Sequence, residues 1–282
     1  MSKWIETYRG VVNPWECDVV EHFTIAYYYD RLADATRNFF DLIEESGGPG
    51  SGPSASSASH ATFQQELRAG AGFHILTAVT GIDAGELRLG HQVVDSTSGK
   101  TVAWIAERHP LLKASNAATN QKLASLSIPW PGPKVRNARA PTAARGMLTA
   151  RDRVKPMEIG EDGTMSLSSQ VHRFSAAGMQ VLAAVGMTVT YMQQQRRGFS
   201  TFELNMTRVG DARIGDIVDV TTSVFHVGNS SLRFNHRMTG PNEREIAFLV
   251  QSGVHLDMDA RRSTAIPDEL RALISKLLVR GP

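Results

Sequence analysis

The sequence predicts an α+β protein built from two copies of one unit, each with an antiparallel sheet wrapped around a central helix. Three observations predict this class. Segments of the second half resemble segments of the first half in the same order. Each half opens with a short strand pattern followed by a helical pattern, and each then continues as strand-like runs separated by turn residues. The length of 282 residues suits two ordinary domains.

The repeat is visible in matching segments at a nearly constant distance. RGVVNPWE at 9–16 resembles RDRVKPME at 151–158, an offset of 142 residues (151−9). ELRLGHQ at 86–92 resembles SLRFNHR at 231–237, an offset of 145 (231−86). Offsets that agree within three residues over this distance indicate two copies of a domain-sized unit.

The expected elements of the first copy follow in order. A strand at 6–12 precedes a helix at 24–43, in which Ile25, Leu32 and Phe39 recur at helical spacing. Gly, Asn and Ser turns then separate strands at 73–83, 86–95 and 101–109. The second copy predicts a strand at 150–156, a helix at 168–186, strands at 217–227, 231–240 and 245–257, and an amphipathic helix at 266–278.

Composition sets the expected boundaries. We expect a first domain at 1–112, a Pro/Ala-rich linker at 113–146 and a second domain at 147–282. The Gly/Ser-rich segment at 46–61 predicts a flexible loop. The two copies are expected to pair as an intrachain pseudo-dimer.

Charge and cysteine content restrict the function classes. The net charge is +2 and no basic run is interleaved with aromatic residues, so we expect no nucleic-acid partner. No apolar run has the length of a membrane span, and none at the start has that of a signal peptide, which favours a cytoplasmic protein with no membrane partner. The single cysteine, Cys17, excludes an intrachain disulfide framework.

Reactive side chains concentrate where the first strand pattern gives way to the helix, in WECDVVEH at 15–22. Asp18 allows two interpretations. It is a favoured helix cap, and it is also an acid placed beside helix N-terminal amides, where it can act as a general base or a nucleophile. Cys17 precedes it, but successive strand residues point oppositely, so we expect Cys17 to face away from a site around Asp18.

This pattern resembles the hotdog-fold acyl-thioester hydrolases of the 4-hydroxybenzoyl-CoA-thioesterase-like families. Asp18 stands at the family's Asp, the residues EHFTI at 21–25 fill the Gly-His-Val-Asn-Asn slots, and Tyr28 stands ten residues after Asp18. Glu21 departs from the family Gly, and Thr24 and Ile25 depart from the Asn pair. The resemblance implies a tandem hotdog enzyme that hydrolyses an acyl-CoA thioester to a free acid and CoA.

The resemblance also implies a site. Asp18 and His22 would be catalytic, with Asp18 as base or nucleophile. Glu21, Phe23, Thr24 and Tyr28 would contact substrate. The helix N-terminal amides would polarise the thioester carbonyl, with the amides of Glu21, His22 and Phe23 as the expected donors. No cofactor is expected apart from the coenzyme A of the substrate, and no metal.

The second copy departs further from the family pattern. At the 142-residue offset, Gly160 lies opposite Asp18, Gly163 opposite Glu21 and Thr164 opposite His22, while Asp162 is displaced by two positions. A tandem chain can form the hotdog pair internally, as in the plant acyl-acyl-carrier-protein thioesterases that this organisation resembles. We therefore expect one acid-bearing site per chain, and further pairing into a homo-oligomer.

Two other functions remain open at this point. One is a non-catalytic hotdog protein that binds acyl-CoA or acyl carrier protein, which the missing acid of the second copy favours. The other is a hotdog dehydratase. Arg196, Arg197 and Arg208 are candidate contacts for coenzyme A phosphates. His91 and His236 recur in the repeat without acidic or cysteine partners at ligand spacing, so repeated strand structure explains them better than a metal.

Overall fold

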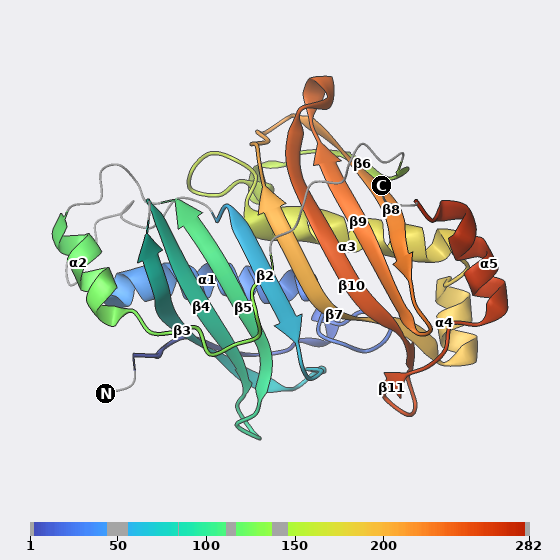
Figure 1. Cartoon of the computed structure of the whole chain (residues 1–282), viewed down its shortest axis with the longest axis horizontal. Coiled ribbons are helices and arrows are strands. Elements are labelled where there is room, and N and C mark those ends of the chain that lie inside the picture. Colours follow the sequence, from blue (N-terminus) through green and yellow to red (C-terminus); the bar gives the residue numbers. More distant parts are fainter. Residues whose placement is uncertain (1–2, 44–55, 84, 111–116, 137–145, 280–282) are drawn as a thin grey trace.

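The structure is a computed structural model that describes residues 3–43, 56–83, 85–110, 117–136 and 146–279. Most of the predicted loop at 46–61 and parts of the predicted linker at 113–146 lie outside the described residues. The two halves of the chain lie side by side, and both contribute strands to one broad sheet (Figure 1).

The first half contains one long helix and five strands. Its elements are β1 (Ile5–Val11), η1 (Pro14–Glu16), α1 (Ile25–Ile43), β2 (Ala58–Phe63), β3 (Gly72–Asp83), β4 (Glu86–Asp95) and β5 (Thr101–Pro110), followed by α2 (Ala117–Leu126). The predicted helix and the three predicted strands after it are all present, with ends shifted by a residue at most.

The second half repeats this order and adds elements at its end. They are β6 (Met147–Arg153), η2 (Pro156–Glu158), α3 (Leu167–Ala184), α4 (Val189–Gln195), β7 (Arg197–Arg208), β8 (Ile217–Val227), β9 (Ser231–Thr239), η3 (Pro241–Glu243), β10 (Glu245–Asp257), β11 (Arg262–Ser263) and α5 (Asp268–Leu277). The strand β7 and the short helix α4 were not among the predicted elements.

The strands form one antiparallel sheet in the order β1-β3-β4-β5-β2-β7-β10-β9-β8-β6, with β11 attached to β10. The two copies join where β2 pairs with β7, for example Ala58 with Thr207 and His60 with Asn205. This seam makes the intrachain pseudo-dimer, because backbone hydrogen bonds run across it without interruption.

The prediction of a flexible loop over all of 46–61 is wrong at its end. Residues 58–61 belong to β2, the strand that joins the two copies, and His60 and Ala61 are buried there. Most side chains in 58–61 are small, which gives this segment the composition of a linker. Pairing with β5 on one side and β7 on the other satisfies its backbone groups.

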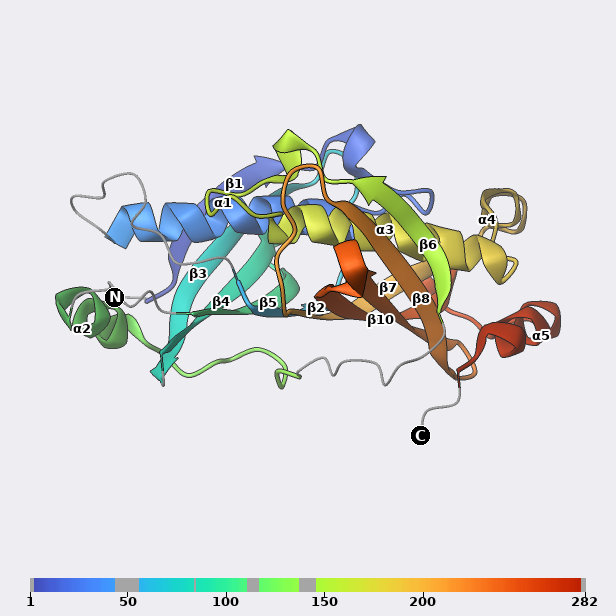
Figure 2. The ribbon, with the colours of Figure 1, turned by 90° about the horizontal axis from the view of Figure 1, so that it is seen from above.

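The two long helices lie next to each other on one face of the sheet (Figure 2). On α1, Tyr29, Leu32 and Phe39 follow the predicted apolar stripe and are almost fully buried. Asp30 of α1 and His172 of α3 occupy equivalent positions of the two copies, and their side chains meet at 2.9 Å. The helices therefore contact around the axis that relates the two halves.

The same buried ion pair ties each long helix to the turn before it. In the second copy Arg173 donates to Glu158, with Nη2 2.7 Å from Oε2, and in the first copy Arg31 contacts Glu16 in the same way. Glu16 is 1% exposed. The Glu that the sequence repeat singles out is thus the structural partner of a helix Arg.

The connecting segment is packed against the first copy. Leu123 of α2 is buried with Phe39 of α1, and the chain then crosses the sheet face opposite the long helices. Trp130 of this segment lies against Trp104 and directly over Gly90, where an added Cβ would meet the Trp130 ring at 2.6 Å. A glycine on β4 therefore makes room for the crossing segment.

Candidate functional site

The turn that carries Asp18 is closed by its own backbone. Cys17 and Phe23 form an isolated antiparallel bridge, and the Asp18 amide donates to the His22 carbonyl at 2.9 Å. Oδ1 of Asp18 accepts the amides of Val20 at 3.0 Å and His22 at 3.1 Å. Asp18 is therefore not the cap of α1, which begins at Ile25. It caps its own turn through Oδ1, while Oδ2 has no partner in the described part of the chain.

Glu21 occupies a backbone conformation that favours glycine. Its φ is +66°, and Gly163, its counterpart in the second copy, has φ +76°. Its side chain points to the rim, where it contacts Arg68 and lies 3.2 Å from Arg261 Nη2. Glu21 is exposed at the rim and is not among the residues that line the pocket, so its contact with substrate stays a prediction.

His22 is buried and lies between groups from both halves of the protein. Its Nε2 lies 2.9 Å from Oε1 of Glu66, which follows β2. The same nitrogen lies 2.9 Å from Nη1 of Arg261, which comes from the hairpin between β10 and β11. A proton on Nε2 can be donated to Glu66, and an unprotonated Nε2 can accept from Arg261. The imidazole thus has a partner in either protonation state.

The pKa values of the two acids in this cluster are shifted in opposite directions, that of Asp18 upward and that of Glu66 downward. Surrounding protein atoms disfavour the charge on Asp18 and raise its pKa, although its side chain still reaches solvent and the amides of His22 and Val20 oppose the rise. Burial also acts to raise the pKa of Glu66, but the hydrogen bond from His22 and the nearby Arg261 charge lower it overall. Carboxylates whose pKa values move apart are typical of acid–base sites.

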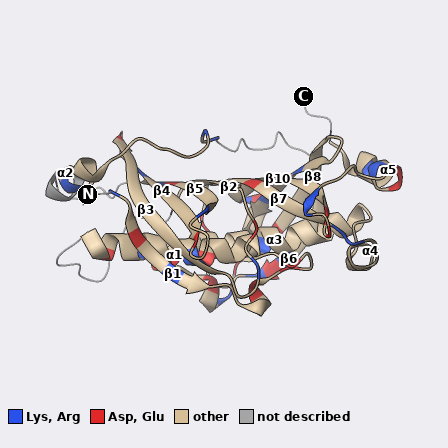
Figure 3. Cartoon of the chain, turned by 90° about the horizontal axis from the view of Figure 1, so that it is seen from below, with Lys and Arg blue, Asp and Glu red and all other residues tan. Residues whose placement is uncertain are grey.

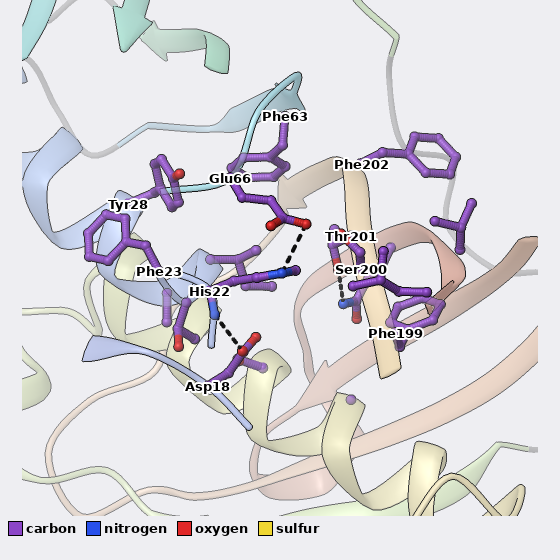
Figure 4. A pocket seen from close by; sticks show the side chains of 18 of the residues that line it. Asp18, His22, Phe23, Tyr28, Phe63, Glu66, Phe199, Ser200, Thr201 and Phe202 are labelled. Carbon is purple, nitrogen blue, oxygen red and sulfur yellow. Dashed lines mark hydrogen bonds and ion pairs between the residues drawn. The ribbon is translucent and has the colours of Figure 1, made fainter. Parts of the chain in front are cut away.

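A cavity of about 580 Å³ opens beside these residues, between the two copies. The turn, the start of α1 and the segment after β2 form one wall, and α3, β7, β10 and the β10–β11 hairpin form the other. Figure 4 shows Tyr28 and Phe23 on one side of His22 and Glu66, with Ser200 and Thr201 of β7 on the opposite side. The site therefore exists only when both halves are paired.

The structure places the remaining predicted residues as follows. Phe23, Thr24 and Tyr28 line the pocket, and the Phe23 and Tyr28 ring centroids lie 4.5 Å apart. Burial raises the pKa of Tyr28, so its hydroxyl stays protonated. The neighbouring Tyr29 instead bonds to Ser59 at 2.9 Å in the core. Cys17 does not line the pocket, and burial raises the pKa of its thiol.

The predicted oxyanion donors are wrong in identity. The Glu21 amide donates to the Asp18 carbonyl at 3.0 Å, the His22 amide to the Asp18 side chain, and the Phe23 amide to the Leu67 carbonyl at 2.8 Å. Ile25 and Ala26, the first residues of α1, line the pocket. First-turn amides lack partners within a helix, so these two fit the predicted role of helix N-terminal donors.

The three candidate phosphate contacts are scattered. Arg196 pairs with Asp259 at 3.0 Å near the rim, and Arg197 pairs with Asp257 at 3.1 Å. Arg208 is the last residue of β7; its side chain contacts Thr164 in the second copy's turn and does not reach the pocket. The two arginines that do line the pocket, Arg261 and Arg262, were not predicted.

The corresponding turn of the second copy is closed to substrate. Oδ1 of Asp162 accepts the Thr164 amide at 2.9 Å and the Thr164 hydroxyl at 2.6 Å, which is the capping role of Asp18. Arg208 stands where the first copy has Phe63 (208−63 = 145), and its side chain donates to Thr164 and to Asp211 at 2.6 Å. The displaced acid is thus held inside an ion-paired turn.

Glu66 was missed because it lies 48 residues after Asp18 (66−18) in an irregular segment. One signal was available. The Phe23 amide meets Leu67 and the Met165 amide meets Ala212 in equivalent bonds, so Glu66 corresponds to Asp211 at an offset of 145 (211−66). An acid at this place in both copies is visible in the sequence once the offset is applied.

Comparisons with known proteins agree with the tandem architecture. A family model described as the thioesterase-like superfamily matches residues 12–137 and again 154–274. The chain belongs to the thioesterase-like superfamily. The two matched segments confirm the tandem resemblance. A comparison with curated proteins found no match.

Two solved structures share the fold of this thioesterase-like protein. The 12:0-ACP thioesterase from Umbellularia californica is 9% identical, with a TM-score of 0.70 over 90% of this chain and 94% of that chain. An acyl-ACP thioesterase from Bacteroides thetaiotaomicron is 12% identical, with a TM-score of 0.64 over 89% and 98%. The expected tandem hotdog architecture is thereby confirmed.

Two further features concern metals and membranes. Within the described ranges, no group of three or more His, Cys, Asp or Glu side chains is arranged to hold a metal ion. No single helix there is long and apolar enough to cross a bilayer, although α3 and α4, bent by 72°, pass the length and composition test together.

Proposed function

We propose that this thioesterase-like protein hydrolyses an acyl-CoA thioester to the free acid and CoA. The observation that carries the proposal is the meeting of Asp18, His22 and Glu66 at a pocket with a mixed polar and apolar lining, formed between two hotdog units. An ionisable acid beside helix N-terminal amides is what thioester hydrolysis requires.

In the proposed reaction, Oδ2 of Asp18 takes a proton from water as the water oxygen bonds to the thioester carbonyl carbon. The amides of Ile25 and Ala26 face the oxygen that gains charge. The carbon–sulfur bond then breaks with its electron pair on sulfur, which receives the proton. His22, held by Glu66 and Arg261, stands beside this path.

Direct attack by Asp18 on the carbonyl carbon is the variant of this mechanism. It would form an acyl anhydride on the Asp18 side chain, which water then hydrolyses. After a single turnover in ¹⁸O-labelled water, label in the Asp18 carboxyl group would establish the covalent path, because it enters only when water attacks the Asp18 carbonyl carbon of the anhydride.

The same pocket also suits an acyl-acyl-carrier-protein substrate, and the names of the two similar structures favour this second candidate. An acidic carrier protein calls for an extended basic face. Figure 3 shows Lys and Arg interspersed with Asp and Glu along the side that it presents, and the rim arginines Arg196 and Arg261 are both ion-paired. This charge pattern favours the small CoA carrier.

A spectrophotometric assay of CoA release tests the proposal. The panel should contain short, long, branched, aromatic and oxygen-bearing acyl-CoA esters, and the same acyl groups on acyl carrier protein. We expect the highest kcat/KM with a CoA ester. Faster turnover of the carrier-protein series would select the second candidate. Tight binding of acyl-CoA without turnover would instead identify a non-catalytic binding protein.

A further inference from the structure

The inner wall of the pocket carries polar side chains that the proposed hydrolysis does not use. Ser175 of α3, Thr201 of β7 and Gln251 of β10 line it together with apolar residues such as Met179 and Leu256. Gln251 is 6% exposed. Gln251 is buried, and Ser175 and Thr201 are half-buried. Polar groups withdrawn from water are expected to have partners, so these side chains call for an explanation.

The orientation of the Gln251 side-chain amide is set by His236, which does not line the pocket. Its Oε1 lies 3.1 Å from Nε2 of His236, whose Nδ1 lies 2.8 Å from the hydroxyl of Thr222. Burial lowers the pKa of His236 to about 4, so the ring is neutral near pH 7 and carries one proton. With that proton on Nε2, the ring donates to the Gln251 oxygen and Nδ1 accepts from the Thr222 hydroxyl. The Gln251 amide nitrogen therefore faces Thr201, to whose hydroxyl oxygen it donates at 2.7 Å.

This chain of bonds leaves hydroxyl protons for the pocket. Because Thr201 Oγ1 already accepts from Gln251, its own proton is free to donate, and no described residue accepts it. Ser175 and Ser200, also in the lining, likewise make no side-chain hydrogen bond to the described residues. A wholly hydrocarbon acyl chain would cover these donors and leave them unpaired, which costs binding free energy.

In the first copy, the positions equivalent to Gly178 and Gln251 are closed off by a hydrogen bond. Thr36 corresponds to Gly178 (178−36 = 142) and Glu107 to Gln251 (251−107 = 144). The Thr36 hydroxyl donates to Glu107 at 3.0 Å and seals that position. In the second copy Gly178 has no side chain, and an added Cβ would lie 3.2 Å from the Gln251 oxygen. The glycine thus leaves the polar group open to the cavity.

We infer that the acyl group of the substrate carries an oxygen substituent on its chain, a hydroxyl or a carbonyl, which is bound by Thr201 with Gln251 and Ser175. The inference rests on the proposed thioester hydrolysis and names the class of acyl group. A site built to hydrogen-bond an oxygen discriminates strongly against the analogue that lacks it.

Matched pairs of acyl-CoA esters test this inference. Each saturated acyl-CoA is compared with hydroxyacyl and oxoacyl esters of equal length, the oxygen being moved one carbon at a time along the chain. We expect one position to raise kcat/KM at least about tenfold over the unsubstituted ester. In Thr201→Val this ratio should fall towards one, whereas Thr207→Val, on the same strand outside the pocket lining, should keep it.

A binding measurement tests the polar subsite separately from the proposed hydrolysis. Free hydroxy acids and plain fatty acids compete for the pocket against a fluorescent acyl probe, with no turnover needed. Tighter binding of the hydroxy acid that Thr201→Val abolishes upholds the polar subsite even if no thioester is hydrolysed, which would refute only the proposed function. Equal kcat/KM and equal binding across all pairs would overturn the inference while leaving the hydrolase intact.

Discussion

Replacing Asp18 by Asn isolates the charge of the candidate base from its structural role. Oδ1 of Asp18 accepts two backbone amides, those of Val20 and His22, and an Asn side-chain oxygen can accept both. Asp18→Ala removes this acceptor and should destabilise the fold by about 1–3 kcal/mol. Asp18→Asn should leave the turn intact and abolish only proton transfer.

The expected loss of kcat for Asp18→Asn is about 100- to 10,000-fold, the usual contribution of a positioned general base. Asp162→Asn is the matched control, because Asp162 caps the equivalent turn of the second copy away from the pocket. The assay is CoA release with the best ester of the panel, accompanied by calorimetric melting of each variant. Retention of more than half the wild-type kcat by a folded Asp18→Asn protein would refute the assignment.

The pH dependence of stability gives this substitution a second readout. The folded-state pKa of Asp18 is raised by desolvation, so the folded protein holds this proton more tightly than the unfolded chain does. The stability from that proton is fully present below the unfolded pKa and is lost as the pH rises through the folded pKa. At neutral pH the charge on Asp18 therefore destabilises the folded state. Asp18→Asn should melt at the same or a slightly higher temperature than the wild type.

Three other substitutions test separate parts of the structure. Glu21→Gly should melt near the wild type, because relief of the left-handed backbone offsets the lost rim ion pairs, whereas Glu21→Val should melt lower in the same calorimetric scan. Burial opposes ionisation of Glu107, but the side chains of His109 and His91, with Nε2 atoms 3.5 and 3.3 Å from Oε2, outweigh it and lower the pKa. Glu107→Leu should cost about 3–5 kcal/mol, measured by urea unfolding. That stabilisation is present above the unfolded pKa of about 4.3 and disappears as the pH falls through the lower folded pKa, so the difference between Glu107→Leu and wild type should shrink in acid. Ala61→Pro interrupts the β2 ladder at the seam and should destabilise by about 3 kcal/mol in the same titration, with loss of activity; unchanged stability would contradict the pairing.

Glu107 and His91 also show what the repeat means. The recurring histidines His91 and His236 sit in equivalent buried networks, bonded through Nδ1 to Thr77 and Thr222. The histidine recurs because, in both copies, this buried strand position is hydrogen-bonded to a threonine of the neighbouring strand. The change from Thr36 to Gly178, together with that from Glu107 to Gln251, separates the sealed copy from the open one.

The sequence by itself determined the elements, their order and their duplication. Alternating apolar residues, helical spacing and turn residues act within a few positions of the chain, so β4, β8 and β10 have the bounds that their pattern predicts, or nearly so. The same local information singled out Asp18 and His22 as candidate catalytic residues, because both lie in one short turn before one helix.

Only the tertiary structure decided which of these residues share a site. Glu66 lies 44 positions after His22 and Arg261 lies 239 after it, yet both meet His22, because β2 pairs with β7 and brings the two halves together. Contacts across that distance depend on sheet register, which no local pattern encodes. The composition of β2 resembled a linker, and its burial between β5 and β7 made it the seam on which the pocket depends.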